Sequence, residues 1–301
     1  MRDTTFYPQA ELLLRCLPSV ASESCFAMKG GTAINMFVRP MPRLSVDIDL
    51  TYVPIEDRKT SLHNISAAIE RIAIKIQKTV PGTKVQRTER DRRIIKLVIH
   101  LKNAIIKIEP NEVLRGTTSE PVTMTLVKEA EELFEMSASV PIVPLADLYG
   151  GKICAALDRQ HPRDLFDVKI LLETEGLTDT IRKGFLVFLC SHDRPMHELI
   201  KPNLKNLTTI FNSEFKGMTS TNIGLEELYE ARALLIQNLQ KTMTSDERNF
   251  LLSLKAGEPK WNLLGVTGIE SLPGIQWKLQ NIQKMNTVKR QEQIAKLEDV
   301  L

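Results

Sequence analysis

The sequence predicts an α+β protein, in which a mixed β-sheet with helices is followed by a mostly α-helical part. Before about residue 140, alternating or short apolar segments typical of strands are interspersed with segments of helical spacing. From Pro144 onward, the apolar residues keep helical spacing in one segment after another. The stretch SASVPIVP between the two parts is rich in Ser and Pro, so we expect two domains, residues 1–140 and residues 141–301.

Strands and helices are expected to alternate in the first part. CFAM (25–28) is a short apolar run, and after KGG the segment TAINMFVR has the pattern of a helix with Thr32 as its N-cap. RLSVDIDL (43–50) alternates strictly between polar and apolar residues, which is typical of a strand with one buried face. Helical spacing then covers residues 60–80, and two apolar segments within 93–110 form a candidate hairpin.

Several helices are expected in the second part. The segments PLADLYGGKICAALDRQ, PRDLFDVKILLETEG and GLEELYEARALLIQNLQKTM keep helical spacing, and LPGIQWKLQNIQKM begins a last helical segment. Thr244 and Glu247 have the spacing of a capping box at the start of another helix. This part is therefore predicted to be a helical domain.

The composition is typical of a globular protein of the cytoplasm. Hydrophobic residues make up 43% and charged residues 26% of the 301 residues, which is enough for a sizeable core. The net charge of +3 permits a nucleic-acid partner but does not require one. The four cysteines form no CxxC pair, which argues against a disulfide framework and a zinc site. With no apolar signal core or membrane span in the sequence, we expect a cytoplasmic location and no membrane partner.

Two carboxylates share the polar face of the strand at 43–50. Asp47 and Asp49 are two residues apart, so both project from the same side of a strand. Because like charges so close repel each other, a cation is expected between them. Magnesium fits best, since it takes one or two carboxylates together with substrate phosphates. The alternative is a surface strand with two solvated aspartates.

The segment MKGGTAIN (28–35) has the composition of a phosphate-binding corner. A strand that ends in Gly-Gly-Thr and leads into a helix lets the backbone approach an anion, which the free N–H groups of the helix then bind. An ordinary strand–turn–helix corner is the alternative. Farther along, Lys107 and Glu109 share a face of a predicted strand, so Glu109 is a candidate third carboxylate, as metal ligand or general base, or else part of an exposed charge pair.

Lys152 lies on or beside the apolar face of its predicted helix. It is three residues from Tyr149 and four from both Leu148 and Ala156. A lysine in this position requires an anion or a path to solvent. Asp164 and Asp167 lie on one side of the next helix and could orient Lys152, or Asp167 could pair with Arg163 at i,i+4.

The motifs together resemble the AbiEii/AbiGii family of abortive-infection toxins, the toxin half of type IV toxin–antitoxin systems. The Gly-Gly-Thr corner, the DxD strand and a later carboxylate have the layout of DNA polymerase β-like nucleotidyltransferases. The segments KGGTAI, RLSVDID and KICAALDRQHPRDLFD stand where the family has a KGGTAL corner, an RxSxDLD strand and a K…R…RDLYD helical segment. The resemblance covers nearly the whole chain.

This resemblance implies a nucleotidyltransferase domain, followed by a helical domain that contributes Lys152 and the RDLFD segment to the active-site cleft. It implies magnesium, a nucleoside triphosphate donor, an acceptor that for some members is the 3′ end of tRNA, and a cognate antitoxin. The implied catalytic residues are Asp47, Asp49, Glu109, Lys152, Asp164 and Asp167, of which Asp47, Asp49 and Glu109 bind the metal. The implied nucleotide-binding residues are Lys29, Gly30, Gly31, Thr32, Arg43, Ser45, Lys152 and Arg163.

The sequence thus favours a magnesium-dependent nucleotidyltransferase that acts on RNA. Two alternatives remain: transfer of a nucleotide to a protein hydroxyl, and a non-catalytic protein of the same fold that binds RNA or a partner. The segment KVQRTERDRR (84–93) contains five basic and two acidic residues, and it is either an RNA-binding run or a solvated loop.

Overall fold

The computed structural model describes residue 2 and residues 4–301. Its chain divides into two compact units, one comprising the residues up to Pro144 together with Lys216–Asn222, and the other comprising Leu145–Phe215 and Ile223–Leu301. The sequence placed the boundary at 140 and did not indicate that a later segment returns to the first unit. The return is made by backbone hydrogen bonds, including one of 2.9 Å from the Leu44 amide to the Met218 carbonyl oxygen.

A mixed β-sheet forms the centre of the first unit. Among the described residues its seven strands have the order β3-β4-β5-β2-β1-β7-β6. The pairs β2–β5 and β1–β7 are parallel, whereas the other neighbouring pairs are antiparallel. The strands are β1 (Phe26–Lys29), β2 (Asp47–Tyr52), β3 (Lys84–Arg90), β4 (Arg93–Leu101), β5 (Ala104–Asn111), β6 (Val122–Thr125) and β7 (Ser139–Ile142).

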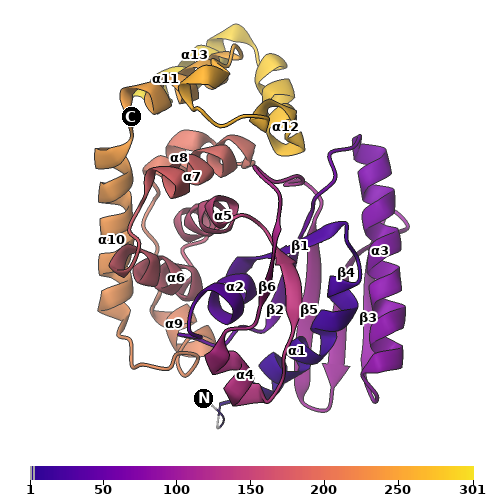
Figure 1. The fold of residues 1–301 in the computed structure, drawn as a ribbon. Helices are drawn as coiled ribbons and strands as arrows, with labels where there is room; N and C mark the ends of the chain where they lie inside the picture. The colour runs from indigo at the N-terminus through magenta and orange to yellow at the C-terminus, as the bar shows by residue number, and fades with distance from the viewer. Residues whose placement is uncertain (1, 3) are drawn as a thin grey trace. The chain divides into compact units, whose positions relative to one another are not determined.

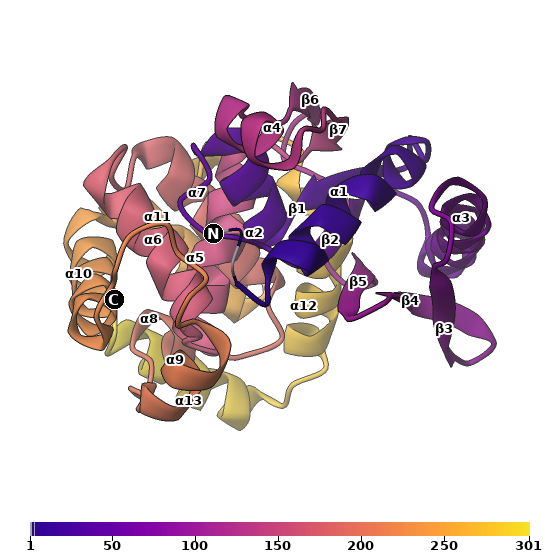
Figure 2. The same cartoon turned by 90° about the horizontal axis from the view of Figure 1, so that it is seen from below.

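Helices cover one face of this sheet. α1 packs on β5 and β7. α3 packs on β3 and β4, and it lies beside these two strands in both views (Figures 1 and 2). The strand side chains that point to this face are buried and apolar, among them Ile48, Leu50, Leu97, Ile99, Ile106 and Ile108. The helical segments of the unit are α1 (Tyr7–Ala21), α2 (Gly30–Ala33), the π-helix η1 (Ile34–Val38), α3 (Arg58–Thr79) and α4 (Lys128–Phe134).

Two local predictions for the first unit are wrong. The helix after β1 begins at Gly30 with Lys29 as its N-cap, so Thr32 lies inside the first turn instead of capping it. β2 begins at Asp47, not at Arg43, because Arg43 and Leu44 pair with the returning segment around Met218 and not with the sheet. The predicted hairpin at 93–110 is confirmed as β4 and β5.

The second unit is helical in its described residues, as the sequence predicts. The predicted capping box is present: the Glu247 amide donates to Thr244 Oγ1 at 3.2 Å, and the Thr244 amide donates to Glu247 Oε2 at 2.8 Å. None of the described helices is both long and apolar enough to cross a bilayer. The segments are α5 (Leu145–Asp158), α6 (Pro162–Glu173), α7 (Asp179–Ser191), α8 (Met196–Ile200), α9 (Thr208–Glu214), α10 (Leu225–Thr242), α11 (Ser245–Ala256), η2 (Trp261–Leu263), η3 (Ile269–Ser271), α12 (Pro273–Gln283) and α13 (Thr287–Glu298).

Candidate active site

The two aspartates of β2 lie in the middle of the sheet, on the face opposite the buried Ile48 and Leu50. Asp47 and Asp49 are both half-buried. The strand register sets Lys29 of β1 beside Asp49 on one side and Glu109 of β5 beside Asp49 on the other. Neighbours in register project from the same face of a sheet. A single row across three strands therefore contains a lysine and two carboxylates.

The Gly-Gly corner is fitted closely to this row. Gly30 has φ of 75°, a left-handed conformation that favours glycine, and a Cβ at this position would clash with Oδ2 of Asp49. A Cβ on Gly31 would likewise clash with the Arg43 guanidinium. Glycine at both positions leaves room for the carboxylate of Asp49 and the guanidinium of Arg43 beside the corner.

The other polar side chains predicted at the corner are buried. The Thr32 hydroxyl contacts the Asp47 carbonyl oxygen at 2.5 Å and Ser45 Oγ at 2.9 Å, and Thr32 is 1% exposed. Arg43 is 2% exposed and donates from Nη1 to the Leu44 carbonyl oxygen at 2.9 Å. These contacts tie the corner to the start of β2, so Thr32, Arg43 and Ser45 fix the position of the aspartate pair.

Glu109 is the predicted third carboxylate. Its Oε1 lies 3.1 Å from the Lys96 ammonium of β4, with 41% of the glutamate side chain exposed. In the part of the chain that the structure describes, no group of three or more Asp, Glu, His or Cys side chains is arranged to hold a metal ion. Asp47 and Asp49 supply two carboxylates, and such a donor set fits magnesium, which completes its coordination with waters and substrate phosphates.

Lys29 differs electrostatically from an exposed lysine. Burial lowers its pKa, and the neighbouring charge of Asp49 partly opposes that shift. A lysine beside Asp49 reduces the repulsion between the two aspartates, and it offers a cation to the oxygens of a bound phosphate.

In the second unit, Lys152 is part of a buried ionic cluster. Its Nζ lies 2.8 Å from Asp164 Oδ1 and 2.9 Å from Asp167 Oδ2, and the three side chains are at most 5% exposed. Arg159 donates to Asp164 from Nε at 2.5 Å and from Nη2 at 2.9 Å. Burial alone would raise the pKa of Asp164, but the charges and hydrogen bonds of Lys152 and Arg159 hold it well below its usual range. The structure thus brings together Lys152 and both of the candidate aspartates.

The residues next to this cluster cap the helix α6. His161 is the N-cap, and its Nδ1 accepts a hydrogen bond of 3.1 Å from the Arg163 amide. Its Nε2 lies 3.1 Å from Glu214, and Arg163 Nη2 lies 3.9 Å from the same carboxylate. Burial lowers the pKa of His161. Its contacts explain His161 as a structural residue of the second unit.

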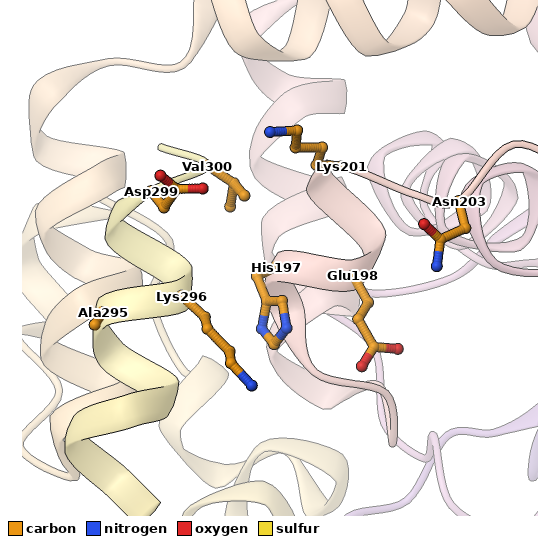
Figure 3. A pocket seen from close by; sticks show the side chains of 8 residues that line it. All are labelled: His197, Glu198, Lys201, Asn203, Ala295, Lys296, Asp299 and Val300. Carbon is orange, nitrogen blue, oxygen red and sulfur yellow. The ribbon is translucent and has the colours of Figure 1, made fainter.

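A groove elsewhere in the second unit contains none of the predicted site residues. It has a volume of about 480 Å³, and His197 of α8 and Lys296 of α13 project from facing helices into it (Figure 3). Two lysines and two carboxylates, Lys201, Lys296, Glu198 and Asp299, line it together. Their formal charges cancel, so the groove shows no preference for an anion.

The sequence indicated candidate site residues, but it did not indicate the side chains that form ion pairs with them. Lys96 lies among apolar residues of its strand, and only the register of β4 and β5 brings it to Glu109. The contact of Arg159 with Asp164 has a sequence signal, since the two are five residues apart across the turn that joins α5 and α6.

A mixed sheet with an aspartate pair beside a Gly-Gly corner defines the nucleotidyltransferase class. A solved structure supports this fold: MenT4, a nucleotidyltransferase toxin from Mycobacterium tuberculosis H37Rv, matches with a TM-score of 0.60 over 92% of each chain at 14% identity. The family model described as "Nucleotidyl transferase AbiEii toxin, Type IV TA system" matches residues 11–281. The chain belongs to this family and is a nucleotidyltransferase toxin of the type IV class. The comparison with curated proteins gave no match.

Proposed function

We propose that this enzyme transfers a nucleotide from a nucleoside triphosphate to the 3′ end of a tRNA, with magnesium as its cofactor. The observation that carries the proposal is the aspartate pair, Asp47 and Asp49, held against the Gly30–Gly31 corner. The mildly basic chain suits an RNA substrate. In the cell, the enzyme acts in the cytoplasm and is restrained by a cognate antitoxin.

The Gly30–Gly31 corner and the two aspartates bind different parts of the nucleoside triphosphate and its metal ion. Asp47 and Asp49 would hold magnesium, which when bound would supply positive charge to the phosphates of the donor. Gly30 and Gly31 begin a continuous helical segment, α2 followed by η1. Their backbone amides donate hydrogen bonds to phosphate oxygens of the donor. Lys29 adds a cation beside Asp49. Positioning and charge neutralisation are the main contributions of such a site.

Glu109 is the residue we propose as general base. It lies beside Asp49 in register, so its carboxylate can accept the proton of an acceptor hydroxyl next to the aspartate pair. The hydroxyl oxygen forms a bond to the α-phosphorus, the bond from that phosphorus to the bridging oxygen breaks, and pyrophosphate leaves. The contribution of Lys152, Asp164, Asp167 and Arg163 to the active-site cleft stays a prediction.

The proposal is tested by incubating the purified protein with each radiolabelled nucleoside triphosphate, magnesium and total RNA. We expect label in the tRNA fraction with the wild type and none with Asp49→Asn, whose fold is checked by circular dichroism. Label in a protein band instead of RNA would favour transfer to a protein hydroxyl. If no triphosphate labels any acceptor, and none stabilises the wild type more than Asp47→Asn, the protein is a binding module.

A further inference from the structure

Beside the candidate active site, three rows of side chains cross the strands β3, β4 and β5 on the face opposite α3. The register aligns Lys84 with His100 and Ile105 in the first row. The second row contains Gln86, Val98 and Lys107, and it ends at Asp47 of β2. The second row therefore leads directly to the aspartate pair.

The third row lies on the other side of the second. Lys96 of β4 is aligned with Thr88 of β3, and its ammonium pairs with Glu109 of β5. Asp49 lies beside Glu109, which completes the row. A β-bulge between Thr88 and Glu89 ends the pattern at this edge.

The lysines of these rows are accessible. Lys84, Gln86 and Lys107 are exposed, and Ile105, near the start of β5, is 47% exposed. On β3, β4 and β5 the three rows contain the lysines 84, 96 and 107 against the single carboxylate of Glu109. This face of β3, β4 and β5 is therefore open and cationic, and it contains an exposed isoleucine.

Three of the four arginines in the basic segment 84–93 form ion pairs. Arg87 points to the opposite face and binds Glu70 of α3 through Nε at 2.6 Å and Nη2 at 2.9 Å. Arg90 and Arg93 both pair with Glu112. Within this run it is therefore Lys84, and not the arginine-rich end, that shares a face with the aspartate pair.

We propose that the lysine face, defined as Lys84, Lys96, His100, Ile105 and Lys107, binds the sugar-phosphate backbone of the acceptor RNA and leads its end to Asp47. Lysine ammonium groups neutralise phosphates. The imidazole of His100 and the apolar side chain of Ile105 offer surfaces against which an unpaired base packs. Strands lie about 4.8 Å apart and alternate residues about 6.6 Å apart, so Lys84 and Lys107 are separated by roughly 12 Å and contact different phosphates.

This inference rests on the proposed function, because it assigns a surface to the RNA acceptor. Its test is the double variant Lys84→Gln/Lys107→Gln, compared with Lys75→Gln/Lys78→Gln. Lys75 and Lys78 are exposed on α3, which packs on the opposite face, so the control removes the same charge from the same unit.

The first measurement is the affinity for fluorescently labelled, unfractionated tRNA, determined by anisotropy over a range of salt concentrations without magnesium or triphosphate. Each lost contact to a single-stranded phosphate lowers the slope of log K against log salt by about 0.7. We expect the Lys84/Lys107 variant to lose about 1.4 from the slope, and the control to keep the wild-type slope. In the transfer assay, KM for tRNA rises severalfold in this variant, whereas the control keeps the wild-type KM for tRNA.

Equal slopes and equal affinities for the two double variants would overturn the inference, and the proposed function would stand if both still label tRNA. A wild type that does not bind tRNA would also overturn it. If tRNA binding depends on Lys84 and Lys107 but no RNA is labelled, the RNA-binding face is supported and the proposed transfer reaction is wrong.

Discussion

Replacing Gly30 with alanine tests whether the corner holds the aspartate pair in its working position. The left-handed conformation of Gly30 costs an alanine about 1–2 kcal/mol. The new Cβ also meets the carboxylate of Asp49, which must turn out of its rotamer at a cost of about 0.5–1.5 kcal/mol. Together these terms give a loss of about 1.5–3.5 kcal/mol of folding free energy.

The loss of activity should exceed the loss of stability. At about 2–4 °C per kcal/mol, the melting temperature of Gly30→Ala falls by roughly 3–14 °C, so most of the protein remains folded at room temperature. A displacement of a catalytic group by about 1 Å costs on the order of 10²-fold in rate. We therefore expect about a hundredfold slower transfer of labelled nucleotide, measured at 20 °C.

Gly82→Ala is the matched control. Gly82 also has a left-handed φ, of 82°, but the nearest atom to a Cβ there is a Leu101 methyl carbon at 3.4 Å, which is an ordinary contact. This variant shares the backbone penalty without touching Asp49, and it should lose stability while keeping its transfer rate. If Gly30→Ala transfers as fast as Gly82→Ala, then the position of Asp49 does not limit the reaction and the reasoning is wrong.

Three further changes test the remaining charged groups. Glu109→Gln should lower kcat by about 10²–10⁴-fold with an unchanged KM for the triphosphate, and an unchanged kcat would exclude Glu109 as the general base. Lys152→Met leaves Asp164 and Asp167 buried without their shared cation, so urea denaturation should show a loss of about 3–5 kcal/mol; a loss below about 1 kcal/mol would contradict this. Because the folded-state pKa of Asp164 is depressed, its contribution to stability is complete at neutral pH and is lost as pH falls below about 4. As pH falls from 7 to 3, the melting temperature of the wild type should therefore decline more than that of Asp164→Asn. Identical declines of the two melting temperatures would refute this contribution of Asp164.

The strand and helix patterns of the sequence were sufficient for much of the fold. Strict alternation identified Asp47 and Asp49 as neighbours on one face, and the two apolar segments within 93–110 are the hairpin β4–β5. Short strands such as β6 and β7 were not predicted, since four residues contain too little periodicity. β3 was interpreted as a basic run because its charges conceal the alternation.

The environment of the corner could not be predicted from local sequence. Arg43 and Ser45 occupy the polar positions of an alternating pattern, which indicates exposure, yet both are buried. Their burial depends on contacts with the corner at Gly31 and Thr32, and Leu44 between them bonds Met218, far along the chain. The alternation of polar and apolar residues describes one strand at a time, whereas tertiary contacts determine the burial of Arg43 and Ser45.

The returning segment Lys216–Asn222 affects the order in which the chain can fold during translation. Arg43 forms a bridge with Thr219, and the Ser220 amide bonds the Pro42 carbonyl oxygen at 3.0 Å. The loop that leads into the aspartate strand therefore gains these partners only after residue 222 has left the ribosome. A nascent chain that ends near residue 150 contains every carboxylate of β2 and β5 but lacks the segment that completes the first unit. The first unit would thus mature late, when most of the polypeptide has been made.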